Sequence, residues 1–454
     1  MKIMLVSLIK DYLRAEKPKK PKGTIFLRFP SLALANLASL TPEDDEITVI
    51  DEQISPIDYN MNVDLVAISV NTSVAKRAYE IADNFRKKGV KVVFGGLHPS
   101  LMPDESLKYA DSIVIGDANE SWKELLIDFK KNKLKRKYIS NQKKPINLPT
   151  PKWEIFKKMS YLNTNFIEVT RGCSHNCKFC STSVFYHHLH RKRPIKEVIR
   201  DIKKVKSFPK NFIFFVDDNI ACDREYAKKL FKALIPLKII WISQATVDIG
   251  EDEELVKLAS ESGCGGLFLG FDSISKLNLE KMNKKHNYIS YLKSVRMLQK
   301  YEIVIEGGFM FGFDNDTKNT FRETLEFLKE SKIESFLAMY LTPIPGTKIY
   351  NEYKKQNKLL TEDHSLYDFR HVVARPKKIT PEELYEGVSF ISKEFYQKKE
   401  MNKRIKRRLF YLLKNPSVKN LFQLIGTIAI NLAFRDRIKN LSKDGTFPKS
   451  YRNI

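Results

Sequence analysis

The sequence predicts an α/β protein with an N-terminal doubly wound parallel sheet, a partial (β/α)6 barrel of the TIM type and a mostly helical C-terminal region. Two observations support this. Short apolar segments alternate with helical segments over the first 130 residues, and six further strand–helix alternations follow over residues 165–345. Strands separated by helices are typical of parallel sheets. We expect a first domain over 1–135, a linker over 136–160, the barrel over 161–350 and a helical, basic region over 351–454.

The first domain contains five strand signals and three helix signals. The predicted strands are 2–7, 46–51, 64–70, 90–96 and 111–117, and the predicted helices are 31–40, 73–89 and 120–131. The first apolar run, KIMLVS, is short, lacks a small-residue cleavage site and soon meets charged residues. It therefore predicts a strand rather than a signal peptide.

Loops at the carboxyl ends of these strands are the expected ligand-binding elements, because ligands of doubly wound sheets bind there. The expected contacts are Asn71, Thr72, Ser73, Gly95, Gly96, His98, Gly116 and Glu120. For His98 the alternative is a turn residue beside Pro99, since a single His without a partner is weak support for a binding role.

The barrel segment repeats the strand–helix pattern six times. Its predicted strands are 166–170, 211–219, 238–244, 266–273, 305–313 and 335–343. Chemistry in TIM-type barrels lies at the C-terminal strand ends, and glycine lets a ligand approach the backbone closely. The expected binding residues at these ends are Asp218, Gln244, Asp272, Gly308 and Gly312. The alternative for each is a cap or a turn residue.

Three cysteines follow the first barrel strand with the spacing C-x3-C-x2-C: Cys173, Cys177 and Cys180. Three thiolates on one loop can hold three irons of a four-iron cluster and leave the fourth iron open for a small ligand. The alternatives are a structural zinc site completed by His175 and an incidental cluster of cysteines. A disulfide framework is not expected, because the chain has only five cysteines. Cys222 and Cys264 lack partners at cluster spacing, so we expect no second iron–sulfur cluster.

The segment EVTRGCSHNCKFCSTSVF, with the aromatic Phe179 before the last cysteine, resembles the radical S-adenosylmethionine (radical SAM) superfamily. The resemblance implies that Cys173, Cys177 and Cys180 ligate a [4Fe-4S] cluster and that S-adenosylmethionine chelates its open iron. Reductive cleavage then gives a 5′-deoxyadenosyl radical, which abstracts hydrogen from the substrate. Phe179 and the strand-end residues become expected cofactor contacts. The family commonly has Glu where Asp272 stands, so this chain keeps the carboxylate but with a shorter reach.

Two segments of the first domain, GGLHPSLMPDE and VIGDANESWKELL, resemble the Rossmann-like cobalamin-binding domain fused to one class of radical SAM enzymes. Domains that supply cobalt with a lower His ligand carry D-x-H-x-x-G after the first strand. Here LIKDYLRAEKPKK follows that strand and contains no His. The resemblance implies cobalamin bound without a protein imidazole. The alternative is a degenerate domain that only shapes the active site.

The expected activity is a cobalamin-dependent C-methyltransferase that acts on an unactivated carbon of a lipid-like or other small molecule of anaerobic metabolism. A flavodoxin or ferredoxin is the expected electron donor. Other members of the class rearrange, cyclise or couple carbons, so a non-methylating radical reaction is the first alternative.

An RNA-modifying radical SAM enzyme is a further alternative, because the chain is strongly basic. Transfer-RNA methylthiotransferases usually carry three additional N-terminal cluster cysteines, whereas residues 1–172 contain none. Nucleic acid is therefore not the expected partner. A non-enzymatic metal-binding protein is the last alternative.

The net charge of +25 favours anionic partners. Residues 401–454 carry 13 Lys or Arg against two Asp, together with an apolar helical stripe. Two interpretations remain open for this tail: helices that pack on the open side of the barrel, and a basic amphipathic surface that touches an anionic membrane. Oxidisable cysteines fit the reducing cytoplasm. The expected location is cytoplasmic, with peripheral membrane contact if the second interpretation holds.

Overall fold

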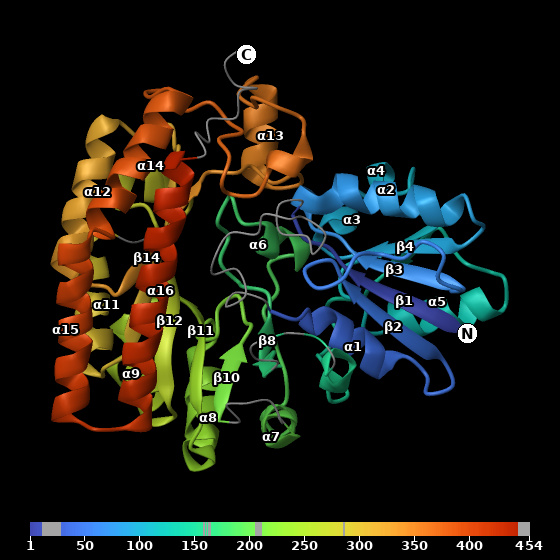
Figure 1. Ribbon diagram of the computed structural model, residues 1–454, viewed down its shortest axis with the longest axis horizontal. Coiled ribbons are helices and arrows are strands. Elements are labelled where there is room, and N and C mark those ends of the chain that lie inside the picture. The colour runs from blue at the N-terminus through green and yellow to red at the C-terminus, as the bar shows by residue number, and fades with distance from the viewer. Residues whose placement is uncertain are drawn as a thin grey trace.

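The computed structural model describes residues 1–10, 29–157, 159, 161, 165–204, 211–284 and 287–443. Figure 1 shows an N-terminal parallel sheet, a barrel-like sheet beside it and C-terminal helices that pack on the barrel. The predicted α/β fold class is confirmed, including the order of its three parts.

The N-terminal sheet has six parallel strands in the order β2-β1-β3-β4-β5-β6. The strands are β1 (Lys2–Ser7), β2 (Glu46–Asp51), β3 (Leu65–Ser69), β4 (Lys91–Gly95), β5 (Ser112–Ile115) and β6 (Lys137–Ile139). The last of these is a short strand that lies within the segment expected to be a linker, and it pairs with β5.

Helices cover both faces of this sheet, which explains why its strands read as near-continuous apolar runs. The helices are α1 (Leu32–Leu40), α2 (Ala75–Arg86), α3 (Leu97–Leu101), α4 (Pro103–Ser106) and α5 (Ser121–Lys130). Ile3 and Leu5 of β1 belong to the core under α1 and α5, whereas Met4 and Val6 belong to the core under α2. Alternate residues of one strand thus face opposite helical layers.

The barrel sheet also has six strands, in the order β14-β13-β12-β11-β10-β7, and every neighbouring pair is parallel. The strands are β7 (Phe166–Ile167), β10 (Phe212–Phe215), β11 (Ile240–Thr246), β12 (Cys264–Asp272), β13 (Val304–Phe311) and β14 (Ser335–Tyr340). The predicted strand 166–170 is divided, because β8 (Thr170–Arg171) leaves the sheet and pairs antiparallel with β9 (Arg191–Lys192).

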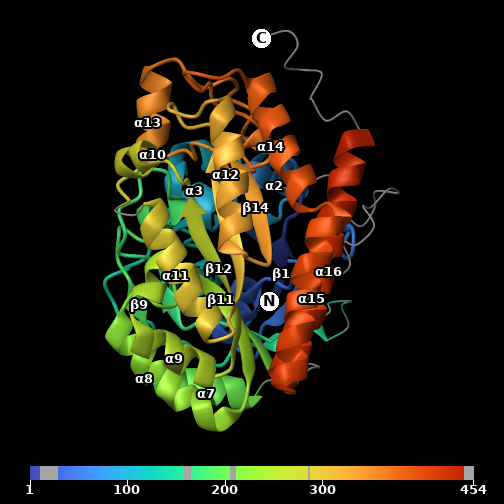
Figure 2. The same ribbon diagram turned by 90° about the vertical axis from the view of Figure 1, so that its left-hand side faces the viewer.

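Helices on the outer face follow the barrel strands, as Figure 2 shows for those in front. They are α7 (Ile195–Lys204), α8 (Arg224–Leu234), α9 (Glu253–Glu261), α10 (Lys276–Lys281), α11 (Tyr288–Lys300) and α12 (Lys318–Ser331). Large buried rings such as Phe271, Phe309 and Phe327 fill the layer between these helices and the sheet.

The C-terminal region is helical. Its helices are α13 (Lys348–Lys355), α14 (Pro381–Phe395), α15 (Lys398–Lys414) and α16 (Val418–Lys443), with a 3₁₀ turn, η7 (His364–Leu366), after α13. The sequence suggests one long helix from residue 381, but the structure breaks it between α14 and α15. The break lets Tyr396 turn inward, where its hydroxyl donates to the Phe336 carbonyl oxygen (2.7 Å) and accepts from the Phe336 N–H (2.9 Å).

Candidate active site

The cysteine loop begins where β8 ends. Gly172 has φ +80°, and a side chain there would lie 2.3 Å from the carbonyl oxygen of Leu189, so glycine alone fits this crowded, left-handed position. The Cys180 N–H donates to the Cys177 carbonyl oxygen (3.1 Å), and α6 (Ser181–Phe185) follows directly. The turn of the chain thus places all three thiols on one short loop at the carboxyl end of the barrel sheet.

Neighbouring segments hold this loop in place. The N–H of Lys178 donates to the Met282 carbonyl oxygen (3.4 Å), and the Lys178 carbonyl oxygen accepts from the Ile349 N–H (3.2 Å). The Asn283 side-chain amide donates to the Asn176 carbonyl oxygen (3.1 Å). The loop is therefore supported before any cofactor binds.

Phe179 is partly buried against an apolar cluster beneath the loop. That cluster consists of Met282, Met310, Phe313, Leu341, Ile349, Tyr353 and Ala374. The ring thus anchors the segment between the last two cysteines.

The donor set of the loop fits an iron–sulfur cluster. Three thiols and no carboxylate come from the segment 173–180. As the structure describes them, the three sulfurs do not all lie within 4.8 Å of one another. Three thiolates from one loop are the donor set that iron–sulfur clusters use in proteins.

Cys222 lies directly against the cysteine loop, a contact that its spacing in the sequence did not indicate. Its sulfur accepts from the Ser174 N–H (3.4 Å) and lies 3.2 Å from the Ser174 hydroxyl. The sulfurs of Cys222 and Cys173 and a ring nitrogen of His175 lie within 4.8 Å of one another. By contrast, Cys264 is buried in β12, where its thiol donates to the Gly266 carbonyl oxygen (3.8 Å).

Asp218, after β10, braces the start of the cysteine loop. Its carboxylate accepts from the Gly172 N–H (3.3 Å) and from the Thr182 hydroxyl (3.1 Å). Burial raises the pKa of Asp218 above its usual value, and these two hydrogen bonds oppose the shift. Asp218 therefore joins the second barrel strand to both ends of the cysteine loop.

Asp272, at the end of β12, is paired with Lys284 in an ion pair that is mostly buried. The Lys284 ammonium also donates to the Gly270 carbonyl oxygen (3.0 Å). Burial raises the pKa of the Cys177 thiol to about 11, with Lys284 lowering and Asp272 raising it. The ion pair is therefore close enough to Cys177 to act on it electrostatically.

The other predicted barrel residues have protein neighbours. Gln244 is partly exposed on β11, and its backbone carbonyl oxygen accepts a hydrogen bond from the Ile220 N–H (3.0 Å). A side chain at Gly308 would lie 2.7 Å from the Phe268 ring, so this ring occupies the space above the glycine. Gly312 has φ +104°, and its N–H donates to the Asp316 carboxylate (2.8 Å).

A cavity of about 330 Å³ lies between the N-terminal sheet and the barrel. From the sheet it is lined by α1 and by the carboxyl ends of three strands, including Gly95, Gly96 and Gly116. The barrel side contributes Glu168, Arg171, Phe185, Tyr186 and Val216. Because Arg171 stands two residues before Cys173, the cavity opens beside the cysteine loop.

Charged side chains close one wall of this cavity and join the two domains. Asp117 forms an ion pair with Arg171 (3.4 Å) and another with Arg191. Arg171 also pairs with Glu168 (2.8 Å) and donates to the side-chain oxygen of Asn119 (2.9 Å). Burial alone would raise the pKa of Asp117, but the two guanidinium groups outweigh it, so the pKa lies below its usual value. This carboxylate therefore stays ionised at the domain junction.

The remaining predicted contacts lie outside the cavity lining. The loop Asn71–Ser73 packs against η7 of the C-terminal region. Glu120 is exposed and pairs with Lys144 (2.8 Å). His98 is fully buried, and its Nε2 lies 2.8 Å from the Tyr79 hydroxyl.

Sequence reasoning missed several charged residues whose roles depend on tertiary contacts, of which the Asp117–Arg171 ion pair joins the two domains. Asp117, Glu168, Arg171 and Lys284 belong to this group, and each is charged yet at most partly exposed. Asp117 and Arg171 stand at the ends of predicted strands, and this position was the one sequence signal that could have marked these two residues as part of the site. Nothing in the sequence indicated that Lys284 would pair with Asp272.

Two family models match the chain. The model described as the radical SAM superfamily matches residues 167–328, and the model described as the B12 binding domain matches residues 29–126. The first match covers the barrel strands except for β14 and the first residue of β7, and the second covers β2 to β5 of the N-terminal sheet.

Two curated relatives come from Chlorobaculum tepidum. The chain is 32% identical over 388 residues to bacteriochlorophyllide d C-12(1)-methyltransferase, covering 82% of this chain and 84% of the relative. It is 33% identical over 371 residues to bacteriochlorophyllide d C-8(2)-methyltransferase, covering 77% and 82%. Among solved structures, the methyltransferase TsrM from Kitasatospora setae, with cobalamin and a [4Fe-4S] cluster bound, superposes with a TM-score of 0.64 at 16% identity, covering 84% of each chain.

Proposed function

This chain belongs to the radical SAM methyltransferase family whose members carry a B12-binding domain, and from that we propose that it methylates an unactivated carbon of a lipid-like small molecule. When bound, a [4Fe-4S] cluster with S-adenosylmethionine supplies a hydrogen-abstracting radical, and cobalamin supplies a transferable methyl group. The relatives named for bacteriochlorophyllides support a hydrophobic substrate.

The observation that carries this proposal is the shared location of the two candidate cofactor sites. Gly95, Gly96 and Gly116 line the sheet side of the inter-domain cavity, and Arg171 on its opposite wall leads directly into Cys173. Radical methylation needs both cofactors to reach one substrate carbon, so their sites must share one space.

The residues of the chain have distinct tasks in this proposal. Cys173, Cys177 and Cys180 hold the cluster, and Asp218 keeps their loop in place through Gly172 and Thr182. Gly95, Gly96 and Gly116 line the sheet side of the space that the corrin ring would occupy. The Asp117–Arg171 ion pair holds the two domains in one relative orientation, which keeps the distance between the two cofactor sites constant.

The test is anaerobic expression with cobalamin, followed by reduction in the presence of S-adenosylmethionine. We expect cobalamin to co-purify, and we expect both 5′-deoxyadenosine and S-adenosylhomocysteine to form with an extract that contains the substrate. Methyl-deuterated S-adenosylmethionine should add a labelled methyl group to an extractable hydrophobic compound. Formation of 5′-deoxyadenosine with a product that lacks the label would show a non-methylating radical reaction instead.

We predict that cobalamin binds without a nitrogen ligand from the protein. No His is found among the described residues that line the cavity, and the buried His98 directs its Nε2 at Tyr79. Electron paramagnetic resonance of the Co(II) form should show no superhyperfine splitting from a protein nitrogen. The His98→Gln variant is the matched control and should give the same spectrum. A nitrogen splitting that disappears in His98→Gln would contradict the prediction.

A further inference from the structure

The hairpin formed by α15 and α16 buries several of its uncharged polar and arginine side chains and exposes several of its apolar ones. Six polar side chains are buried against the barrel or between the two helices: Arg404, Arg408, Asn420, Gln423, Thr427 and Asn431. Seven apolar side chains are more than 40% exposed: Leu409, Phe410, Leu413, Val418, Leu421, Ile425 and Leu432. A helix that only covers a barrel buries its apolar stripe, which is the opposite arrangement.

The buried polar side chains fix this orientation. Gln423 donates to the carbonyl oxygens of Gly265 (2.8 Å) and Glu302 (2.7 Å), which precede or begin barrel strands. Asn431 donates to the Glu334 carbonyl oxygen (3.0 Å) and accepts from Arg404 (3.0 Å). Rotating α16 to bury its apolar residues would break these hydrogen bonds, and buried polar groups without partners are costly.

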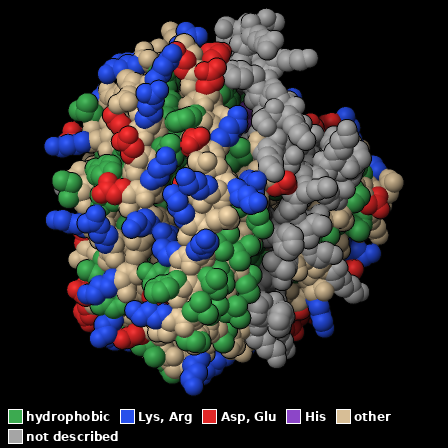
Figure 3. Space-filling view, turned by 60° about the vertical axis from the view of Figure 1, so that its left-hand side comes forward, with side chains coloured by type: hydrophobic (Ala, Val, Ile, Leu, Met, Phe, Trp, Pro, Cys, Tyr) green, Lys and Arg blue, Asp and Glu red, His purple; other side chains and the backbone are tan. Residues whose placement is uncertain are grey.

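The exposed apolar residues form a surface around the turn between α15 and α16, which we call the hairpin ridge. Phe410 and Leu413 precede the turn, and Val418 and Leu421 follow it. Figure 3 shows apolar side chains gathered on the lower part of this face, bordered by Lys and Arg. An exposed apolar patch of this kind marks an interaction site.

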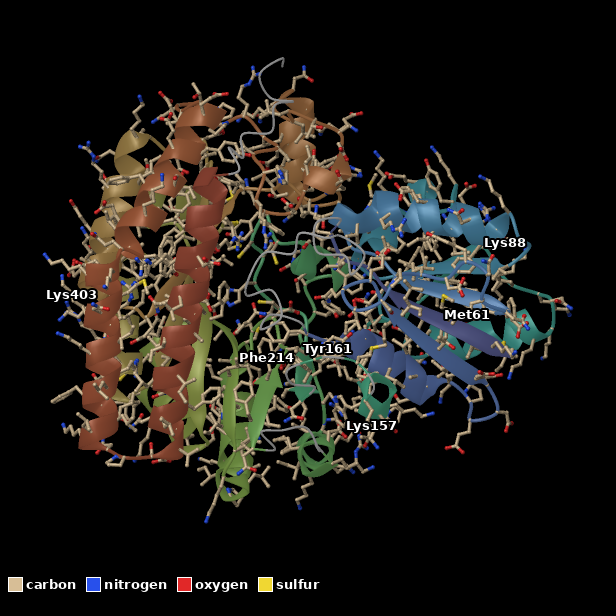
Figure 4. All side chains as sticks on the ribbon, in the orientation of Figure 1. Met61, Lys88, Lys157, Tyr161, Phe214 and Lys403 are labelled. Carbon is tan, nitrogen blue, oxygen red and sulfur yellow. The ribbon has the colours of Figure 1, made fainter. Side chains whose placement is uncertain are left out.

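The exposed charged side chains of α15 near the turn are basic. Residues 401–435 contain eight Lys or Arg and no Asp or Glu, although Arg404 and Arg408 are buried. Lys403, Lys406 and Lys414 are exposed on α15, and Figure 4 shows Lys403 pointing away from the barrel. A second copy of the chain would bring like charges together on this surface. An anionic bilayer complements both the apolar and the basic side chains.

We propose that the hairpin ridge docks on the surface of an anionic bilayer. Among the described residues, no helix has the length and apolar character needed to cross a membrane, so the contact would be interfacial. Asn415 donates to Glu302 (2.7 Å), which lies in the turn before β13, and Lys419 donates to Ser260 (3.0 Å), which lies near the end of α9 and before β12. The ridge is therefore at the end of the barrel opposite the cysteine loop. It recruits the protein to a membrane and does not form the active-site mouth, so the proposal goes beyond the proposed reaction and is independent of it.

The test is flotation of the full-length protein with vesicles of phosphatidylcholine and phosphatidylglycerol. We expect binding at low salt, weaker binding as salt screens the lysines, and none with pure phosphatidylcholine. Leu413→Glu should lower the bound fraction by about tenfold, because it removes apolar burial and adds a like charge to the lipid. Leu277→Glu is the matched control, because Leu277 of α10 is also an exposed leucine (61%, against 71% for Leu413). This variant should float like the wild type.

Without vesicles, the wild type, Leu413→Glu and Leu277→Glu should cleave S-adenosylmethionine reductively at the same rate. A loss of vesicle binding can therefore be told apart from a loss of the proposed activity. Two flotation results would overturn the proposal: no flotation of the wild type on anionic vesicles at low salt, or equal flotation of Leu413→Glu. A wild-type dimer in solution that Leu413→Glu converts to a monomer would assign the ridge to a second copy of the chain, and would also overturn it.

Discussion

The variant Cys177→Ala should purify without a [4Fe-4S] cluster and should not cleave S-adenosylmethionine. The loop offers three thiols for three irons, and the other thiol beside it, Cys222, lies against Cys173 and Ser174 rather than in the loop position of Cys177. Losing one of three ligands leaves a site too weak to retain the cluster. Iron and sulfide analysis after anaerobic reconstitution, together with the visible absorption of the cluster, measures the effect.

Two further cysteine variants make this test specific. Cys264→Ala removes a buried thiol of β12 and should keep the full iron content. Cys222→Ala should also keep it, because the three loop ligands remain, although Cys222 lies against Ser174 in the same loop. Full iron loading of Cys177→Ala would contradict the assignment of the cluster to this loop. Iron loss in Cys222→Ala would show that the fourth thiol contributes to cluster binding.

The variant Arg408→Ala should lower the free energy of unfolding of the barrel by about 3 kcal/mol, at the lower end of the range for breaking a buried ion pair. The Arg408 guanidinium donates to the Glu334 carboxylate at 2.6 Å and 3.0 Å, and both side chains are nearly inaccessible to solvent. Arg407 also pairs with Glu334 (2.9 Å) and would remain, which limits the loss. Denaturant unfolding followed by tryptophan fluorescence, with Lys406→Ala as the exposed control on α15, measures it.

A double variant separates loss of the charge pair from loss of packing. Arg408→Met with Glu334→Gln removes both charges and keeps an acceptor for the Ile305 N–H, which donates to Glu334 (2.9 Å). It should recover much of the stability, because the two fully buried charges are removed together and only the partly exposed Arg407 loses its ion pair. If Arg408→Ala and Lys406→Ala unfold alike, the pair contributes no more than an exposed one.

The same ion pair predicts a dependence on pH. Burial on its own raises the pKa of Glu334, but Arg408 and Arg407 outweigh it, so the pKa lies below its usual value. A carboxyl with a lowered folded pKa stabilises the protein above its unfolded pKa of about 4.3 and loses this contribution as the pH falls through the folded pKa. The stability difference between wild type and Arg408→Ala should therefore be full at pH 7 and should shrink in acid. A difference that grows in acid would contradict the prediction.

Local patterns in the sequence predicted most strands of both sheets. The alternating segment 46–51 is β2, and the apolar segment 305–313 covers all of β13 except its first residue. In contrast, β6 has only three residues between lysines, and its pairing with β5 defines it as a strand. The segment 166–170 divides into β7 and β8 because Asp217 accepts hydrogen bonds from the Val169 N–H and the Thr170 hydroxyl, a long-range contact that no local pattern carries.

The sequence by itself determined the fold class, the family and the three candidate cluster ligands, because each depends on residues close together in the chain. The tertiary structure alone decided what surrounds them. Arg171 and Asp117 form their inter-domain ion pair only when two separate sheets meet, and Cys222 reaches Ser174 only through the loop after β10. The same holds for the hairpin ridge: an apolar stripe fits either packing or a membrane, and the hydrogen bonds of Gln423 to barrel carbonyl oxygens decide which side of the helix is left exposed.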